Sequence, residues 1–116
     1  MAIILNRSGF EHAERLIKEG EFETFDADWH EERPTPDEVG NFINTHYIQE
    51  YGLWFLAMND QYPDTTTEYY EYPHGDLKEV QRCALVHSMT HAEKNGHKEI
   101  AHAAKKLIDM IDALNK

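Results

Sequence analysis

The sequence predicts a small α+β domain, with an antiparallel sheet of two to four strands packed with about four helices. Three observations lead to this prediction: amphipathic segments that begin at N-capping residues, an apolar run of six residues between them, and a Thr/Tyr-rich segment after a turn-rich loop. The chain has 116 residues, so we expect one domain over 1–116.

The first two helices are predicted from their N-terminal signals. Ser8 and Glu11 have the spacing of a capping box, and the apolar stripe that follows ends at Gly20. A fuller signal is Thr35–Glu38, in which a threonine N-cap precedes a proline and a glutamate comes three residues later. We expect this second helix to continue to about Glu50.

The last two helices are predicted to form an antiparallel αα-hairpin. Asp76 is expected to cap a third helix, with Glu79 three residues later, and Asn95-Gly96 to end it. A fourth helix over 97–114 has a continuous apolar stripe from Ile100 to Leu114.

Two strands are expected between the second and third helices. Leu53–Met58 is apolar on both pleat faces, which is typical of a central strand covered on both sides. Residues 65–73, "TTTEYYEYP", indicate a half-exposed edge strand that ends at Pro73. The central strand could also pair with Ile3–Leu5 or with Phe22–Phe25. Residues 26–34 are expected to form a solvated loop anchored by Trp29.

The net charge of −11 is concentrated in the first two thirds of the chain. Residues 1–38 carry eleven acids and four bases, residues 39–75 carry five acids and no base, and residues 76–116 are nearly balanced. Such a field disfavours direct binding to nucleic acid. It leaves open contact with a basic protein, including mimicry of nucleic acid.

Further composition argues for a protein of the cytoplasm without a membrane span. The longest apolar run has six residues, whereas a spanning helix needs about 20. The start of the sequence lacks the pattern of a signal peptide. The single cysteine, Cys83, cannot form an internal disulfide, which is typical of a reducing compartment.

One block of short motifs extends from the predicted central strand into the predicted third helix. It contains Trp54-Phe55-Leu56, Asp64-Thr65, Tyr70–Asp76 and Val80–Cys83, that is W-x-L, D-T, Y-x-Y-P-x-G-D and V-x-R-C. It resembles short uncharacterised proteins of bacterial type. The resemblance implies no activity.

Three histidines are the candidate metal ligands. His87 and His91 stand four residues apart on one face of the expected third helix, and His46 lies on the apolar face of the second. Three imidazoles could hold a divalent transition metal and leave a position open for water. However, the intervening residues lack the glutamate of H-E-x-x-H. We therefore expect these rings to be partly buried core residues, and no cofactor.

Two other groups of polar residues are weaker candidates for a catalytic or ion-binding role. Cys83 stands four residues before His87, but a free cysteine among apolar neighbours is usually a small buried hydrophobe. The acidic cluster of His30–Glu32 with Asp26 and Asp28 lacks the spacing of a calcium loop.

Tyrosines and acids gather around the predicted edge strand and suggest a partner-binding surface. Tyrosine is enriched where proteins meet partners. The candidate contact residues are Tyr62, Tyr69, Tyr70, Tyr72, Glu68 and Glu71.

These observations favour a protein-interaction or regulatory module that contacts a protein partner or a second copy of itself and has no catalytic activity of its own. The alternatives are a metal-dependent hydrolase that uses the histidines and an acidic nucleic-acid mimic.

Overall fold

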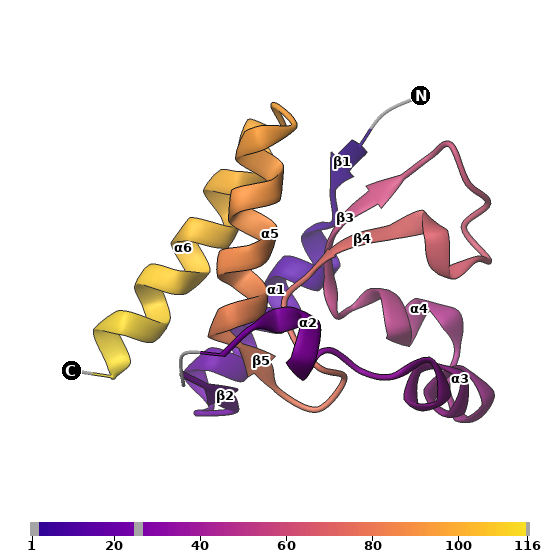
Figure 1. Ribbon diagram of the computed structural model, residues 1–116, viewed down its shortest axis with the longest axis horizontal. Helices are drawn as coiled ribbons and strands as arrows, with labels where there is room; N and C mark the ends of the chain where they lie inside the picture. Colours follow the sequence, from indigo (N-terminus) through magenta and orange to yellow (C-terminus); the bar gives the residue numbers. More distant parts are fainter. Residues whose placement is uncertain (1–2, 25–26, 116) are drawn as a thin grey trace.

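The computed structural model describes residues 3–24 and 27–115 and confirms the predicted α+β class. Helices pack around a small three-stranded antiparallel sheet (Figure 1). In chain order the elements are β1 (Ile3–Leu5), α1 (Arg7–Lys18), β2 (Phe22–Glu23), α2 (Trp29–Glu32), α3 (Pro36–Thr45), α4 (Ile48–Gly52), β3 (Phe55–Asn59), the 3₁₀ helix η1 (Thr67–Tyr69), β4 (Tyr70–Pro73), β5 (Val80–Gln81), α5 (Arg82–Lys94) and α6 (Lys98–Leu114).

The predicted central strand is β3, which lies between β1 and β4. Both neighbours run antiparallel to it, with Leu5 opposite Ala57 on one side and Phe55 opposite Pro73 on the other. Leu56 and Ala57 point to opposite faces of the sheet, and both are fully buried. The prediction that β3 is covered on both sides is therefore confirmed at its centre.

The predicted edge strand is real but shorter than expected, because Thr67–Tyr69 forms a 3₁₀ turn before β4. Of the two further pairing segments, Ile3–Leu5 pairs with β3. Phe22–Glu23 pairs instead with β5, in a separate parallel ladder. The prediction for this segment, Phe22–Phe25, also included Phe25, which lies outside the described residues.

The C-terminal helices α5 and α6 lie side by side as the predicted hairpin (Figure 1). Gly96 joins them with a φ of +77°, a left-handed conformation that glycine adopts without steric cost. The α6 stripe is buried from Ile100 to Ile111, with Leu107 and Ile111 fully inaccessible, whereas Leu114 at its predicted end is exposed. Helices α1 and α6 contact β3, and α5 contacts β4, so the core lies between these helices and the sheet.

The first helix begins two residues earlier than its sequence signal. Asn6 is the N-cap, and the expected capping box of Ser8 and Glu11 does not form. The Asn6 side chain instead donates hydrogen bonds to the carbonyls of Gly52 (2.9 Å) and Phe55 (3.1 Å). Because these contacts tie the end of β1 to the region before β3, tertiary structure sets where α1 begins.

The second predicted helix is divided in two. The capping box is confirmed: Glu38 N–H donates to Thr35 Oγ1 (3.2 Å), and Thr35 N–H donates to Glu38 Oε1 (3.0 Å). Helix α3 nevertheless ends at Thr45, because His46 and Tyr47 are extended before α4 begins. The prediction of one helix to Glu50 is therefore wrong.

The third predicted helix begins five residues later than expected, with Gln81 and not Asp76 as its N-cap. Asp76 Oδ1 accepts hydrogen bonds from the backbone of Lys78 (3.1 Å) and Glu79 (3.0 Å), as an N-cap would, but the segment it stabilises is a turn. Leu77 has a φ of +71°, which no α-helix accommodates. The chain then forms β5 before α5 begins at Arg82.

The predicted loop over 26–34 contains the short helix α2, and Trp29 is buried as expected. Asp26 lies outside the described residues. Within the described chain, no helix combines the length and the apolar character that crossing a membrane requires.

Candidate functional site

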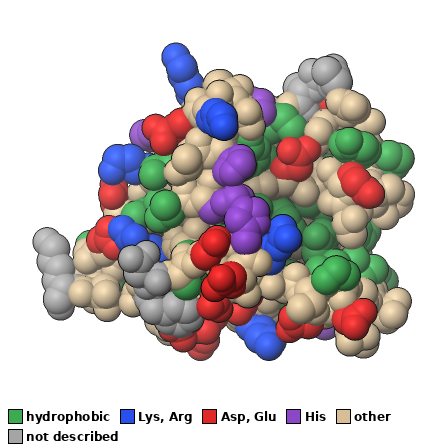
Figure 2. All heavy atoms as spheres, in the orientation of Figure 1, with side chains coloured by type: hydrophobic (Ala, Val, Ile, Leu, Met, Phe, Trp, Pro, Cys, Tyr) green, Lys and Arg blue, Asp and Glu red, His purple; other side chains and the backbone are tan. Residues whose placement is uncertain are grey.

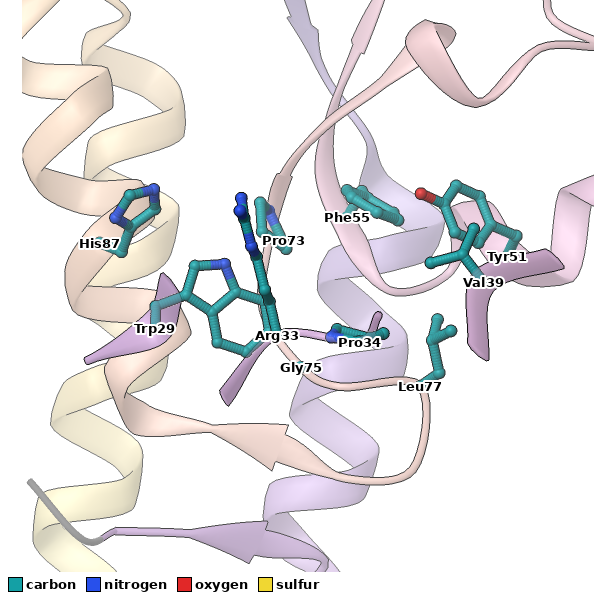
Figure 3. A pocket seen from close by; sticks show the side chains of 10 residues that line it. All are labelled: Trp29, Arg33, Pro34, Val39, Tyr51, Phe55, Pro73, Gly75, Leu77 and His87. Atoms are coloured by element: carbon teal, nitrogen blue, oxygen red, sulfur yellow. The ribbon is translucent and has the colours of Figure 1, made fainter. Parts of the chain in front are cut away.

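A cleft of about 330 Å³ lies where α2, α3 and α4 meet the sheet, the turn between β4 and β5, and α5 (Figure 3). Its volume is within the range of small-ligand sites. Its lining residues are Trp29, Arg33, Pro34, Val39, Tyr51, Phe55, Pro73, Gly75, Leu77 and His87.

One wall of the cleft is built by α2 and the residues that follow it. Asp28 caps α2 by accepting a hydrogen bond from His30 N–H (3.0 Å), and the helix buries Trp29. Arg33 ends α2 in an extended conformation, and Pro34 leads directly into the Thr35 cap of α3. Arg33 is thereby held between two helix ends, and in Figure 3 its side chain runs up into the cleft.

The opposite wall is aromatic and aliphatic. The Tyr51 and Phe55 rings pack with their centroids 4.8 Å apart. Burial, followed by the nearby Glu68 carboxylate, raises the pKa of Tyr51 to about 12, so its hydroxyl is neutral and remains a donor. In Figure 3 that hydroxyl points toward Phe55, on the inner side of the cleft.

The charge of the cleft is opposite to that of the molecule. The chain has 22 acidic residues, yet none of those that the structure describes lines the cleft, which instead carries the Arg33 guanidinium and the His87 imidazole. Arg33 is also the only lysine or arginine between Lys18 and Lys78. It forms no ion pair with any described carboxylate. The cleft therefore combines apolar walls with a cation that has no ion-pair partner among the described side chains.

The electrostatic environment of His87 favours its neutral form. Burial is the largest cause that lowers its pKa below the ordinary value, and the neighbouring His91 and His30 and the Arg33 guanidinium lower it further. Asp28 acts in the opposite direction. In the free protein, His87 thus resists the positive charge that an anion beside it would favour.

The predicted grouping of His46 with His87 and His91 is wrong. His46 is exposed at the end of α3, where its ring stacks on Phe42 with centroids 3.9 Å apart. His91 is exposed and His87 half-buried, because the buried face of α5 carries Ala84, Leu85, Ser88 and Ala92. The expectation that these three rings are partly buried core residues is wrong for His46 and His91, which are exposed, and holds for His87 only in that its ring is half-buried.

A different histidine joins the pair on α5. The ring of His30 contacts that of His87 (centroids 5.1 Å apart), and His87 contacts His91 (4.3 Å). Figure 2 shows histidine side chains gathered on one face of the molecule. Within residues 3–24 and 27–115, no three histidine, cysteine or acidic side chains are arranged to hold a metal ion.

The candidate partner-binding residues do not share one exposed surface. Tyr62 is exposed, whereas Tyr69 and Tyr70 are half-buried. Tyr72 is buried, and its hydroxyl bonds His97 Nδ1 (2.7 Å) at the turn between α5 and α6. It is therefore a structural residue.

The two acids of that set also differ. Glu68 is exposed, but Glu71 is half-buried and accepts a hydrogen bond from Asn59 Nδ2 (2.6 Å) across the sheet. The tyrosine-rich segment thus contributes more to packing than to an open contact surface.

Cys83 lacks the environment of a thiol nucleophile. Burial, followed by the Glu32 carboxylate, raises the pKa of the thiol. It therefore remains protonated near neutral pH. The acidic cluster around His30–Glu32 contributes an N-cap (Asp28) and one ring of the histidine group.

His74 is the buried polar group that the sequence did not single out. It is fully buried, and its Nε2 bonds the Leu53 carbonyl (2.7 Å). Its Nδ1 has no hydrogen-bond partner among the residues that the structure describes. Burial is the main cause that lowers the pKa of His74 to about 4, so the ring is neutral in the folded protein.

Sequence reasoning missed Arg33 and Tyr51 as functional candidates. The available signal was charge isolation: a lone arginine beside a tryptophan and two prolines, in a long acidic segment. Tyr51 has no such signal, because its place depends on the break between α3 and α4.

Comparisons with protein-family models, with curated proteins and with solved structures gave no significant match.

Proposed function

We propose that this chain is a binding protein whose cleft takes an anionic group attached to an apolar or aromatic body. The observation that carries the proposal is the cleft's composition: apolar walls, no acidic residue, and the guanidinium of Arg33 without an ion-pair partner among the described side chains. Pockets of this kind, apolar with a few convergent polar groups, are typical ligand sites.

The residues of the cleft have distinct parts in such binding. A guanidinium presents paired N–H donors that match the two oxygens of a carboxylate. His87 can add a second cation, and the neutral Tyr51 hydroxyl a further donor. Trp29, Phe55 and the aliphatic residues would remove the ligand's apolar body from water.

The expected affinity is modest. Burying one large apolar side chain contributes about 1.5–3 kcal/mol, and a charge-assisted hydrogen bond about 1.5–3 kcal/mol. Association itself costs several kcal/mol. We therefore expect dissociation constants in the micromolar to millimolar range for small probes.

We propose that the anion comes from a protein partner. It is the C-terminal carboxylate of a chain whose last residue is large and apolar. This retains the expectation of a protein-interaction module and moves its contact from the tyrosine-rich segment to the cleft. A free carboxylic acid has the same chemistry, and the experiment separates the two sources.

Isothermal titration calorimetry tests the proposal with two matched pairs of probes. The first pair is 3-phenylpropionate and 3-phenylpropionamide; the second is a pentapeptide that ends in phenylalanine, as the free acid or the amide. We expect each acid to bind and each amide to bind at least tenfold more weakly. Tighter binding of the peptide acid than of 3-phenylpropionate would identify the protein source.

Arg33→Gln should abolish this preference for the acids. Arg15→Gln is the matched control, because it removes the same charge from an exposed position on α1, outside the cleft lining. Equal affinity for acids and amides in the unaltered protein would contradict the proposal.

The metal-dependent hydrolase stays an alternative prediction that the described side chains do not favour, because no three of them are arranged to hold a metal ion. His30, His87 and His91 form a continuous series of ring contacts. Elemental analysis of protein purified without a histidine tag would test this candidate. Near-stoichiometric zinc, nickel or iron, lost in His87→Ala/His91→Ala, would favour it over the binding protein.

We also propose that the protein acts in the cytoplasm and pairs with a second copy of itself or with a protein partner. The single free cysteine supports the first statement, and the exposed apolar side chains of Tyr47 and Tyr62 support the second. Light scattering over a range of concentrations would reveal a homodimer.

A further inference from the structure

The histidine group occupies one side of the cleft that we propose as the binding site. His87 lines the cleft, His91 lies one turn further along α5, and His30 approaches from α2. The ring centroids are only 4.3 Å and 5.1 Å apart, so a proton on His87 is felt by both neighbours.

The groups that face His87 are mostly cationic when charged. His91 faces it from α5, and His30 and Arg33 face it from α2 and its C-terminal end. Among the described groups, Asp28 is the carboxylate that acts on it, and that carboxylate already accepts a hydrogen bond from His30 N–H. Cys83, one turn earlier on α5, is held in its neutral form by burial and Glu32.

An anion in the cleft would reverse this balance. Seated between the Arg33 guanidinium and the His87 ring, it would neutralise the first and attract a proton to the second. By linkage, a ligand that favours the protonated ring binds more tightly when the ring is protonated beforehand.

We infer that the cleft takes up a proton on His87 together with its anionic ligand, so that binding strengthens as the pH falls. The inference rests on the proposed function and adds its regulation. It makes the protein a pH-sensitive binder, with Arg33 as the permanent charge and His87 as the variable one.

The magnitude follows from linkage. One proton fully coupled to binding changes the dissociation constant about tenfold for each pH unit. Binding takes up less than one full proton on His87 at pH 7.5 and at pH 6.0. We therefore expect the dissociation constant of 3-phenylpropionate to fall at least about threefold between these two pH values.

Calorimetry at these two pH values, in buffers with different enthalpies of ionisation, measures both the affinity and the number of protons taken up. The unaltered protein should show tighter binding at pH 6.0 with net proton uptake. His87→Gln should lose the proton uptake and the pH dependence. His102→Gln, which replaces an exposed histidine on α6 outside the cleft, should retain both.

A measurement without ligand keeps the inference testable if His87→Gln fails to fold. In the free protein, ring titration by NMR should show a higher pKa for His87 in His91→Gln than in the unaltered chain, because one cationic neighbour is removed. An unchanged His87 titration in that variant would contradict the inference.

The calorimetry distinguishes failure of this inference from failure of the proposed function. Equal affinity at both pH values, with binding still dependent on Arg33, overturns the inference and leaves the proposed function. Absence of binding at both pH values overturns the proposed function and the inference with it.

Discussion

Lowering the pH should destabilise this protein through His74. The ring is fully buried, and its pKa in the folded protein is about 4, against an ordinary value of 6.5. Folding therefore favours the neutral ring. The contribution of the neutral ring is complete above pH 6.5 and is lost as the pH falls from 6.5 toward 4.

The size of the effect follows from the difference between the two pKa values. Each pKa unit is equivalent to about 1.4 kcal/mol, so complete protonation would cost about 3 kcal/mol, and the loss by pH 5 is about 2 kcal/mol. For a domain of this size, that is a considerable part of a total stability of about 5–15 kcal/mol. Burial also lowers the pKa of His12, which adds a loss of the same sign.

Urea unfolding at pH 7.5 and pH 5.0 measures the effect. His74→Gln keeps a side-chain donor for the Leu53 carbonyl but does not titrate. The unaltered protein should lose about 2 kcal/mol more than this variant between the two pH values. His102→Gln, at an exposed position on α6, should behave like the unaltered chain. If His74→Gln loses as much stability as the unaltered protein, the account of His74 is wrong.

Three further changes test the packing by thermal or urea unfolding. Gly52→Ala would place a Cβ in the Tyr70 ring and should lower the free energy of unfolding by about 1–3 kcal/mol. The control Gly40→Ala, on an open face of α3, should be neutral or raise it by up to about 1 kcal/mol. Equal effects of the two changes would contradict the contact between Gly52 and Tyr70. Ser88→Ala should cost about 1–3 kcal/mol, because buried Ser88 donates to the Pro73 carbonyl (2.6 Å), and no loss would show that the carbonyl is satisfied without it. Tyr72→Phe should cost about 1 kcal/mol by removing the hydroxyl bond to His97, and a cost near zero would show that this bond does not stabilise the α5–α6 turn.

Local signals in the sequence predicted the elements whose stability is itself local. The capping box at Thr35 needs only residues three apart, and the α6 stripe needs only helical periodicity. Both were correctly predicted, because no distant contact competes with them.

The same kind of signal failed where tertiary contacts or backbone conformation decide. Asp76 accepts the backbone hydrogen bonds expected of an N-cap, and only the positive φ of Leu77 makes the segment a turn. Asn6 starts α1 through bonds to residues 46 and 49 positions away. No local pattern contains that information.

The candidate site was least accessible to sequence reasoning because it is assembled from distant segments. His30 and His87 are in contact although 57 positions separate them in the sequence, and the face of α5 depends on where that helix begins. The N-cap predicted at Asp76 lies at Gln81, and the buried face of α5 carries Ala84, Leu85, Ser88 and Ala92, so that His87 lies on the side of the cleft and not in the core.

The two tryptophans allow the most direct test of the cleft. Trp29 lines it, whereas Trp54 is outside the lining and packs against His12 (centroids 4.9 Å apart) and His74 (5.5 Å). In a ¹H–¹⁵N NMR titration with 3-phenylpropionate, the Trp29 indole signal should shift to saturation while that of Trp54 stays in place, and Arg33→Gln should abolish the shift. A Trp29 signal that does not move, or one that moves equally in Arg33→Gln, would contradict an anion-binding cleft.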